Sequence, residues 1–167
     1  CRRRIALHGP AAEGGVGLFF RERYPLLLQP FLDAVGEVIE PGQMLDHACR
    51  HCFELNLIGE PSFAIFRRRS PAAAGGFDER LPQLLDWEFF TRFFVDRPLL
   101  FAREELGVYH LHAQAESLRN SARDHYPEVH RLQGIALERF GHLLGDERRR
   151  ALEGRRAEIA RLAGLGA

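Results

Sequence analysis

Three stretches of the chain carry apolar residues at the three- and four-residue steps of an α-helix. The first covers residues 43–55, the second covers residues 86–95, and the third begins near Pro127, which suits a first helical turn. In the second stretch aromatic residues cover most of the surface, and Glu88 and Arg92 are four residues apart on the remaining face. We therefore expect this helix to be buried on most sides, with an ion pair between the two charged residues.

Short apolar runs bounded by glycine, proline or charged residues predict strands. Such runs occur at residues 5–7, 16–20, 63–66, 99–101 and 107–109. A glycine-rich loop separates the first two runs, but its spacing does not match a phosphate-binding G-x-G-x-x-G loop. We expect it to be a turn between strands.

The remaining segments predict helices. Residues 24–38 are apolar but interrupted by two prolines and a glycine, which indicates a short helix between irregular pieces. After Asp124 the apolar residues recur at helical spacing, Gly145 interrupts them, and Asp146 begins a second helical pattern. The sequence thus predicts two parts: an α/β body over residues 1–122 and a helical hairpin over residues 123–167.

Four short motifs follow one another between residues 50 and 120. They are, in order, Gly59-Glu60-Pro61-Ser62, Ile65-Phe66-Arg67-Arg68, residues 75–81 (GGFDERL) and Asp86-Trp87-Glu88, followed by Tyr109-His110-Leu111-His112. This order resembles the C-terminal, acceptor-side half of the family 2 glycosyltransferases of the GT-A fold. In that family a G-x-P-S segment enters a strand ending in F-R-R, a G-G-F-D-E-R-L turn follows, and an E-D or D-W-[DE] motif starts a helix. The resemblance implies an α/β fold with a partial GT-A-like mixed sheet, flanking helices and the C-terminal hairpin.

The resemblance also implies an activity. The intact enzyme would transfer a sugar from a nucleotide-sugar donor to a hydroxyl group of a sugar or lipid-linked acceptor. Such a transfer with inversion needs a carboxylate that takes the acceptor proton, and the family motif assigns this general base to Asp86. The alternative for Asp86 is a plain helix N-cap. Glu88 is the second candidate catalytic residue, either supporting the site or simply pairing with Arg92, and Leu85 stands where many relatives have a glutamate.

Several further residues would bind substrate according to the same resemblance. The candidate acceptor-binding residues are Asn56, Gly59, Glu60, Ser62, Gly76 and Trp87. Trp87 has a competing interpretation as a core residue. Gly75 and Gly76 should adopt positive φ in the turn, and Asp78 and Arg80 should stabilise that turn by local hydrogen bonds.

A divalent metal, manganese or magnesium, is the cofactor that the resemblance implies for the intact enzyme. Some relatives complete the metal site with a histidine at a strand end, which corresponds to His112 here. His110 lies two residues earlier, where arginine is common in the family. The chain contains no Asp-x-Asp, the motif that begins the metal site in those relatives. A structural or surface role is the alternative for both histidines.

The cysteines and the charged residues bear on other classes of function, namely zinc or redox sites, nucleic-acid binding and membrane contact. Cys49 and Cys52 lie inside a helical pattern without a second cysteine pair, so we interpret them as incidental rather than as a zinc or redox motif. The net charge is +0, so the protein as a whole has no electrostatic attraction for nucleic acid. All 23 basic residues are arginine, which excludes catalysis that depends on a lysine side chain. The arginine-rich final segment is interleaved with glutamates and predicts a solvated face, with peripheral contact to an anionic membrane as the alternative.

The 167 residues are 46% hydrophobic and 28% charged, which is typical of a globular domain, and no apolar run approaches the roughly 20 residues of a membrane span. We expect a cytoplasmic protein, with the inner face of the membrane as the alternative place. Because the chain begins with Cys1, we expect a fragment that lacks the donor-binding half. The competing hypothesis is a non-catalytic interaction or acceptor-docking module derived from such an enzyme.

Overall fold

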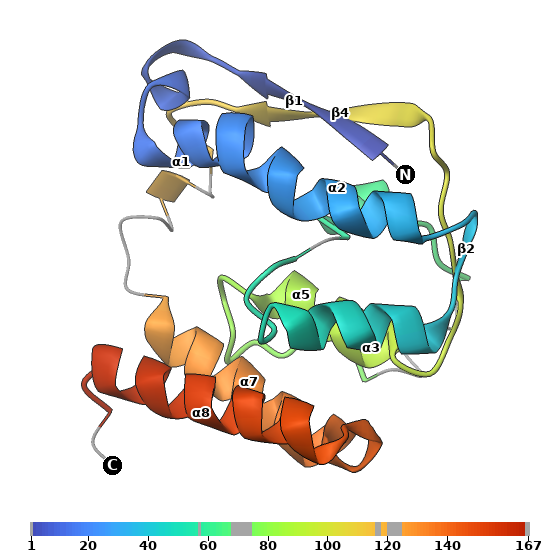
Figure 1. Cartoon of the computed structure of the whole chain (residues 1–167). Helices are drawn as coiled ribbons and strands as arrows, with labels where there is room; N and C mark the ends of the chain where they lie inside the picture. Colours follow the sequence, from blue (N-terminus) through green and yellow to red (C-terminus); the bar gives the residue numbers. More distant parts are fainter. Residues whose placement is uncertain (1, 57, 68–74, 116–117, 120–124, 166–167) are drawn as a thin grey trace.

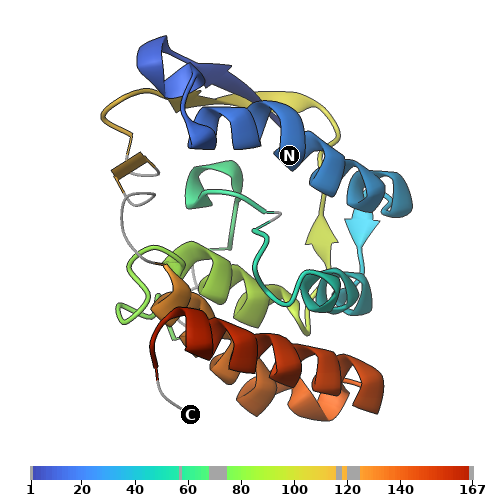
Figure 2. The same cartoon turned by 60° about the vertical axis from the view of Figure 1, so that its left-hand side comes forward.

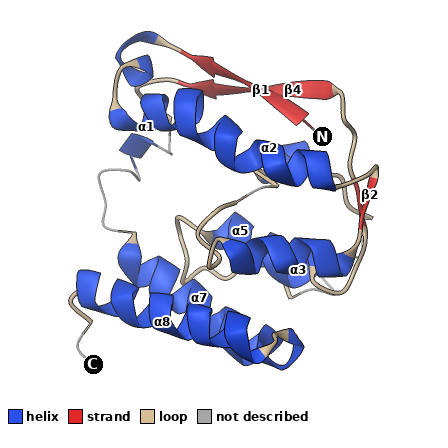
Figure 3. Cartoon of the chain, viewed as in Figure 1, coloured by secondary structure: helices blue, strands red, loops and turns tan. Residues whose placement is uncertain are grey.

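The computed structural model describes residues 2–56, 58–67, 75–115, 118–119 and 125–165. Its elements in chain order are β1 (Arg2–Leu7), η1 (Gly9–Ala12), α1 (Gly15–Leu18), the π-helical η2 (Phe19–Arg23), α2 (Tyr24–Ala34), β2 (Val38–Ile39), α3 (Pro41–Arg50), η3 (Pro61–Phe63), α5 (Leu85–Phe94), β3 (Leu99–Leu100), β4 (Glu105–Leu111), α7 (Tyr126–Phe140), η4 (Gly141–Leu143) and α8 (Asp146–Leu162). The fold is therefore mixed α/β, with helices in the majority (Figure 3).

The elements are arranged in successive layers (Figures 1 and 2). At one end β1 and β4 form a parallel pair, α1 and α2 lie beneath it, α3 and α5 follow, and α7 and α8 form the opposite end. At the side of the molecule, β2 and β3 form a short antiparallel pair with Ile39 opposite Leu99. Instead of one mixed sheet, the described residues form two separate pairs of strands, joined through the helices between them.

Strong helical periodicity located the helices well. The helix expected over residues 86–95 is confirmed as α5, and the helical hairpin is confirmed as α7 and α8. The helix expected over residues 43–55 corresponds to α3, which starts and ends earlier than predicted. It begins at Pro41, where Gln43 Oε1 accepts from the Glu40 N–H at 2.9 Å. It ends before Cys52 and Phe53, because both have left-handed φ values of 47° and 59°.

The strand predicted over residues 16–20 is wrong, because this segment is helical. Phe20 packs its ring against Tyr24, one helical turn later, with 5.5 Å between the ring centroids. It also reaches the Tyr109 ring on β4 at 5.8 Å. A short apolar run is compatible with either a strand or a helix, and contact with the inner face of the sheet favours the helix here.

The strand predicted over residues 63–66 is also wrong: a 3-10 turn at η3 leads into an irregular segment. Phe63 packs against the inward face of β4 at Gly107, where an added Cβ would collide with the Phe63 ring. Phe66 then packs edge-on against the Phe93 ring of α5, with 5.2 Å between the centroids. This segment therefore fills space between the sheet and α5 rather than extending a sheet.

One hydrophobic core runs through the helical layers. It contains residues from α2, α3, α5, α7 and α8, including the fully buried Phe90, Leu132 and Leu152. Because Leu132 lies on α7 and Leu152 on α8, the hairpin shares its core with the preceding body. The side chains that anchor the start of α5 are held by the same core.

Candidate functional site

The candidate site is built around the start of α5. The helix begins at Leu85, with Leu84 as its N-cap, so Asp86 is a residue of the first turn and not the N-cap considered from the sequence. Asp86 Oδ1 accepts a hydrogen bond from the Trp87 N–H at 2.6 Å, and its side chain is half-buried. The helix dipole favours a carboxylate at this place.

Glu128 of α7 binds the backbone that enters α5. Its Oε2 accepts hydrogen bonds from the Gln83 N–H at 2.8 Å and from the Leu84 N–H at 3.2 Å. The Leu84 N–H also donates to the Leu81 carbonyl at 3.2 Å, so Glu128 shares this amide with the preceding turn. The hairpin thus supplies a carboxylate that holds the backbone entering α5, a contact that the sequence does not reveal because the partners are about 45 positions apart along the chain.

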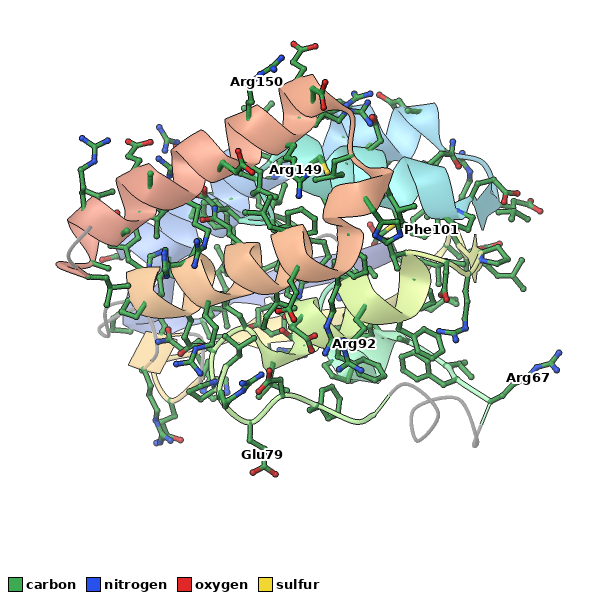
Figure 4. All side chains as sticks on the ribbon, turned by 90° about the horizontal axis from the view of Figure 1, so that it is seen from below. Arg67, Glu79, Arg92, Phe101, Arg149 and Arg150 are labelled. Carbon is green, nitrogen blue, oxygen red and sulfur yellow. The ribbon has the colours of Figure 1, made fainter. Side chains whose placement is uncertain are left out.

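Glu88 and Arg92 form a buried ion pair on α5, confirming the expected pairing at i and i+4. Arg92 Nε donates to Glu88 Oε1 at 2.8 Å and Arg92 Nη2 donates to Glu88 Oε2 at 2.9 Å, while the side chains are only 2% and 13% exposed. Hydrogen bonding to Glu88 raises the pKa of Arg92 above its usual value. Arg92, labelled in Figure 4, also donates from Nη2 to the Gly76 carbonyl at 2.6 Å, which holds the glycine turn against the helix.

The glycine turn has the conformation that the sequence predicts. Gly75 and Gly76 have φ values of 85° and 72°, in the region that favours glycine. Asp78 Oδ1 accepts from the Arg80 N–H at 3.1 Å and from Arg80 Nε at 2.8 Å. These hydrogen bonds lower the pKa of Asp78 to about 2. The turn is therefore held by its own side chains and, through Arg92, by α5.

Trp87 is a core residue, 1% exposed, so its ring offers no surface to an acceptor in this structure. Its Nε1 donates to the Phe53 carbonyl at 2.8 Å, and Gln133 Nε2 donates to the neighbouring Cys52 carbonyl at 3.0 Å. Left-handed φ at two consecutive non-glycine residues is energetically unfavourable. Trp87 and Gln133 hold this turn at the entrance to the segment that contains Asn56.

The predicted acceptor loop begins with a compact turn at Asn56. Asn56 Oδ1 accepts from the Ile58 N–H at 3.1 Å and from the Gly59 N–H at 2.9 Å, and Gly59 has a φ of 84°. Asn56 is therefore engaged with its own loop, and Gly59 is buried. Glu60 is half-buried and Ser62 is exposed, so Ser62 is accessible to a molecule in solution.

His112 lies immediately beyond the end of β4 and is exposed. Its Nδ1 accepts from the Gln114 N–H at 3.3 Å. Magnesium and manganese prefer several oxygen ligands. In the described part of the chain, no group of three or more His, Cys, Asp or Glu side chains is placed to hold a metal. The described residues around His112 therefore do not make a manganese or magnesium site by themselves.

The cysteine pair lies at the end of α3 with both thiols free. Burial raises the pKa of Cys49 to about 11 and also raises the pKa of Cys52. Burial, together with His51 and Arg50, lowers the pKa of His47 to about 4. Neutral, protonated thiols of this kind are poor nucleophiles and poor metal ligands.

Comparison with known proteins finds a relative of part of the chain. Over 77 residues the chain is 35% identical to the uncharacterized protein MT1568 of Mycobacterium tuberculosis (strain CDC 1551 / Oshkosh). The match covers 46% of this chain and 23% of that protein, so it spans about a quarter of the relative's length. No family model and no solved structure matches the chain. Within the described residues no helix has the length and apolar character needed to cross a membrane.

Proposed function

We propose that this chain is the acceptor-side part of a family 2-like glycosyltransferase of the GT-A fold, which transfers a sugar from a nucleotide-sugar donor to a hydroxyl acceptor. One observation carries the proposal: two motifs of the sequence resemblance are bonded together in space. Arg92 binds both Glu88, two residues after Asp86 on the first turn of α5, and the carbonyl of Gly76 in the glycine turn. A catalytic base needs this kind of rigid support.

In the proposed reaction the oxygen of the acceptor hydroxyl attacks the anomeric carbon of the donor sugar and the nucleotide leaves. Asp86 takes the proton of that hydroxyl as the new bond forms. Glu88 is a positioning residue, because both of its carboxylate oxygens are bound by Arg92 and its side chain is 2% exposed. Trp87 and Gly76 likewise act by holding the backbone around the base. Ser62 and the half-buried Glu60 are the loop residues proposed to bind acceptor hydroxyls.

A manganese or magnesium ion at the donor diphosphate would neutralise charge on the leaving nucleotide. The nucleotide-sugar donor and the sugar or lipid-linked acceptor remain predictions, as does a place at the inner face of the membrane. The second candidate function is a non-catalytic acceptor-docking module. The absence of an Asp-x-Asp from the sequence favours it for this chain.

The proposal is tested with the purified full-length protein, UDP-, GDP- and dTDP-sugars, manganese and a panel of hydroxyl acceptors, with nucleotide release and glycosylated product as readouts. We expect transfer by the unmodified protein and transfer that is at least about a hundredfold slower by Asp86→Asn. An unreduced rate of transfer by Asp86→Asn would remove Asp86 as the base. Acceptor binding without any transfer would favour the docking module.

A further inference from the structure

His8 and His110 lie side by side at the carboxyl ends of β1 and β4. The backbone N–H of His8 donates to the Leu111 carbonyl at 2.9 Å, which continues the parallel pairing of the two strands to His8. His8 Nε2 and His110 Nδ1 are 2.8 Å apart, with 5.1 Å between the ring centroids and 17° between the ring planes. The fold thus brings together two imidazoles that are 102 positions apart along the chain.

Both imidazoles are on the solvent-exposed face of the strand pair. Along β4 the side chains alternate. Leu106, Val108 and His110 are exposed, and the residues between them lie on the face toward the helices. On β1, Arg4 shares the exposed face with His8. Over residues 4–8 and 106–110 this face therefore offers two imidazoles and no carboxylate.

We propose that His8 and His110 together bind a divalent transition-metal ion of the type that favours imidazole, namely Zn²⁺, Ni²⁺ or Cu²⁺, in place of their mutual hydrogen bond. Imidazole nitrogen is a common ligand for these ions. Two metal–nitrogen bonds of about 2.05 Å place the nitrogens about 2.9 Å apart at a right angle and about 3.3 Å apart at a tetrahedral angle. The observed 2.8 Å is already close to the first value.

Metal binding requires only local changes at this pair. The two nitrogens now face each other, so each ring must turn until both lone pairs reach one ion. Both side chains are exposed, so the main contact that this rotation changes is the stacking of the two rings on each other. A ring that now donates from the nitrogen facing its partner binds the ion after its N–H hydrogen moves to the other nitrogen of the same ring, and water completes the coordination.

This site is separate from the metal expected for sugar transfer. Manganese and magnesium prefer oxygen ligands, which this face does not offer over residues 4–8 and 106–110. His112, the strand-end histidine, accepts the Gln114 N–H at Nδ1 and is not part of the pair. The inference therefore does not depend on the proposed glycosyltransferase function, and either can fail without the other.

The test is a titration of the chain, prepared without a histidine tag, with Zn²⁺, Ni²⁺ and Cu²⁺ by calorimetry, with nitrogen coordination read from the Cu²⁺ electron paramagnetic resonance spectrum. We expect one ion per chain, and His8→Ala or His110→Ala should each weaken binding by about tenfold or more. His112→Ala and the exposed His142→Ala are controls that should change the affinity by less than about twofold.

Three results would overturn the proposal. They are the absence of binding by the unmodified chain, binding by His8→Ala and His110→Ala that is as tight as that of the unmodified chain, and a loss of affinity in His112→Ala as large as that in His110→Ala. Circular dichroism and thermal unfolding without metal check that the variants fold, which is expected because exposed side chains contribute little to stability.

Discussion

Replacing Arg92 with leucine should strongly destabilise the protein. Leucine removes both hydrogen bonds to Glu88 and the 2.6 Å bond to the Gly76 carbonyl, and it leaves a carboxylate that is 2% exposed without its cation. Breaking a buried ion pair by removing one partner costs about 3–5 kcal/mol, mainly because the remaining charge is buried and unpaired. We therefore expect Arg92→Leu to lower the free energy of unfolding by about that amount.

The chain offers a matched control for this prediction on α8. Arg149 and Glu153 also form an i, i+4 pair, but their closest atoms are 3.5 Å apart and their side chains are 51% and 53% exposed. Exposed pairs of this kind contribute less than about 1 kcal/mol. Arg149→Leu should therefore unfold in urea at nearly the same midpoint as the unmodified chain, whereas the midpoint of Arg92→Leu should fall sharply.

A double-mutant cycle of Glu88→Leu, Arg92→Leu and the double variant tests whether the unpaired buried charge causes this loss of stability. Replacing both Glu88 and Arg92 with leucine removes the two charges together, and such a change is often neutral or stabilising. We expect the double variant to recover most of the stability lost in Arg92→Leu. If Arg92→Leu and Arg149→Leu lost equal stability, or the double variant lost the sum of the single losses, the argument from an unpaired buried charge would be refuted.

Two further predictions concern stability. Glu128→Gln should lower the free energy of unfolding by about 1 kcal/mol, because a neutral amide oxygen is a weaker acceptor for the backbone amides that enter α5; the exposed Glu138→Gln on the same helix is the control. Since the pKa of His47 is lowered from 6.5 to about 4 in the folded protein, its contribution to stability is complete above pH 6.5. That contribution should be lost as the pH falls from 6.5 to 4, by at most about 3 kcal/mol. His47→Phe should flatten the unfolding free energy over this range, and an unchanged slope would contradict the assignment.

Local patterns predicted part of this fold. The aromatic stripe of α5 and the apolar spacing of the hairpin located those helices, because helical periodicity is visible within a dozen residues. Gly75 and Gly76 were predicted to have positive φ because two glycines between structured segments indicate a turn. The Glu88–Arg92 pair was predicted from its spacing, although the spacing gave no indication that the pair is buried.

The errors arose where distant contacts decide the structure. Phe63 was assigned to a strand, but it fills the space over Gly107 on a strand more than 40 positions later. Glu128 and Gln133 stabilise backbone that lies 44 to 81 positions earlier, and neither residue belongs to a recognisable motif. Left-handed φ at Cys52 and Phe53 was equally unpredictable, because Trp87 and Gln133 supply the hydrogen bonds that hold this turn.

The most direct test of the central proposal is the turnover number of Asp86→Asn in the full-length protein, measured with the donor that supports transfer. A general base contributes about 10²–10⁴ in rate, so kcat should fall by at least that lower factor while the melting temperature and the acceptor KM stay close to those of the unmodified protein. Glu79→Gln is the control, because this carboxylate belongs to the same motif region but points into solvent (Figure 4). Equal kcat values for Asp86→Asn and Glu79→Gln would contradict the proposal that Asp86 is the catalytic base.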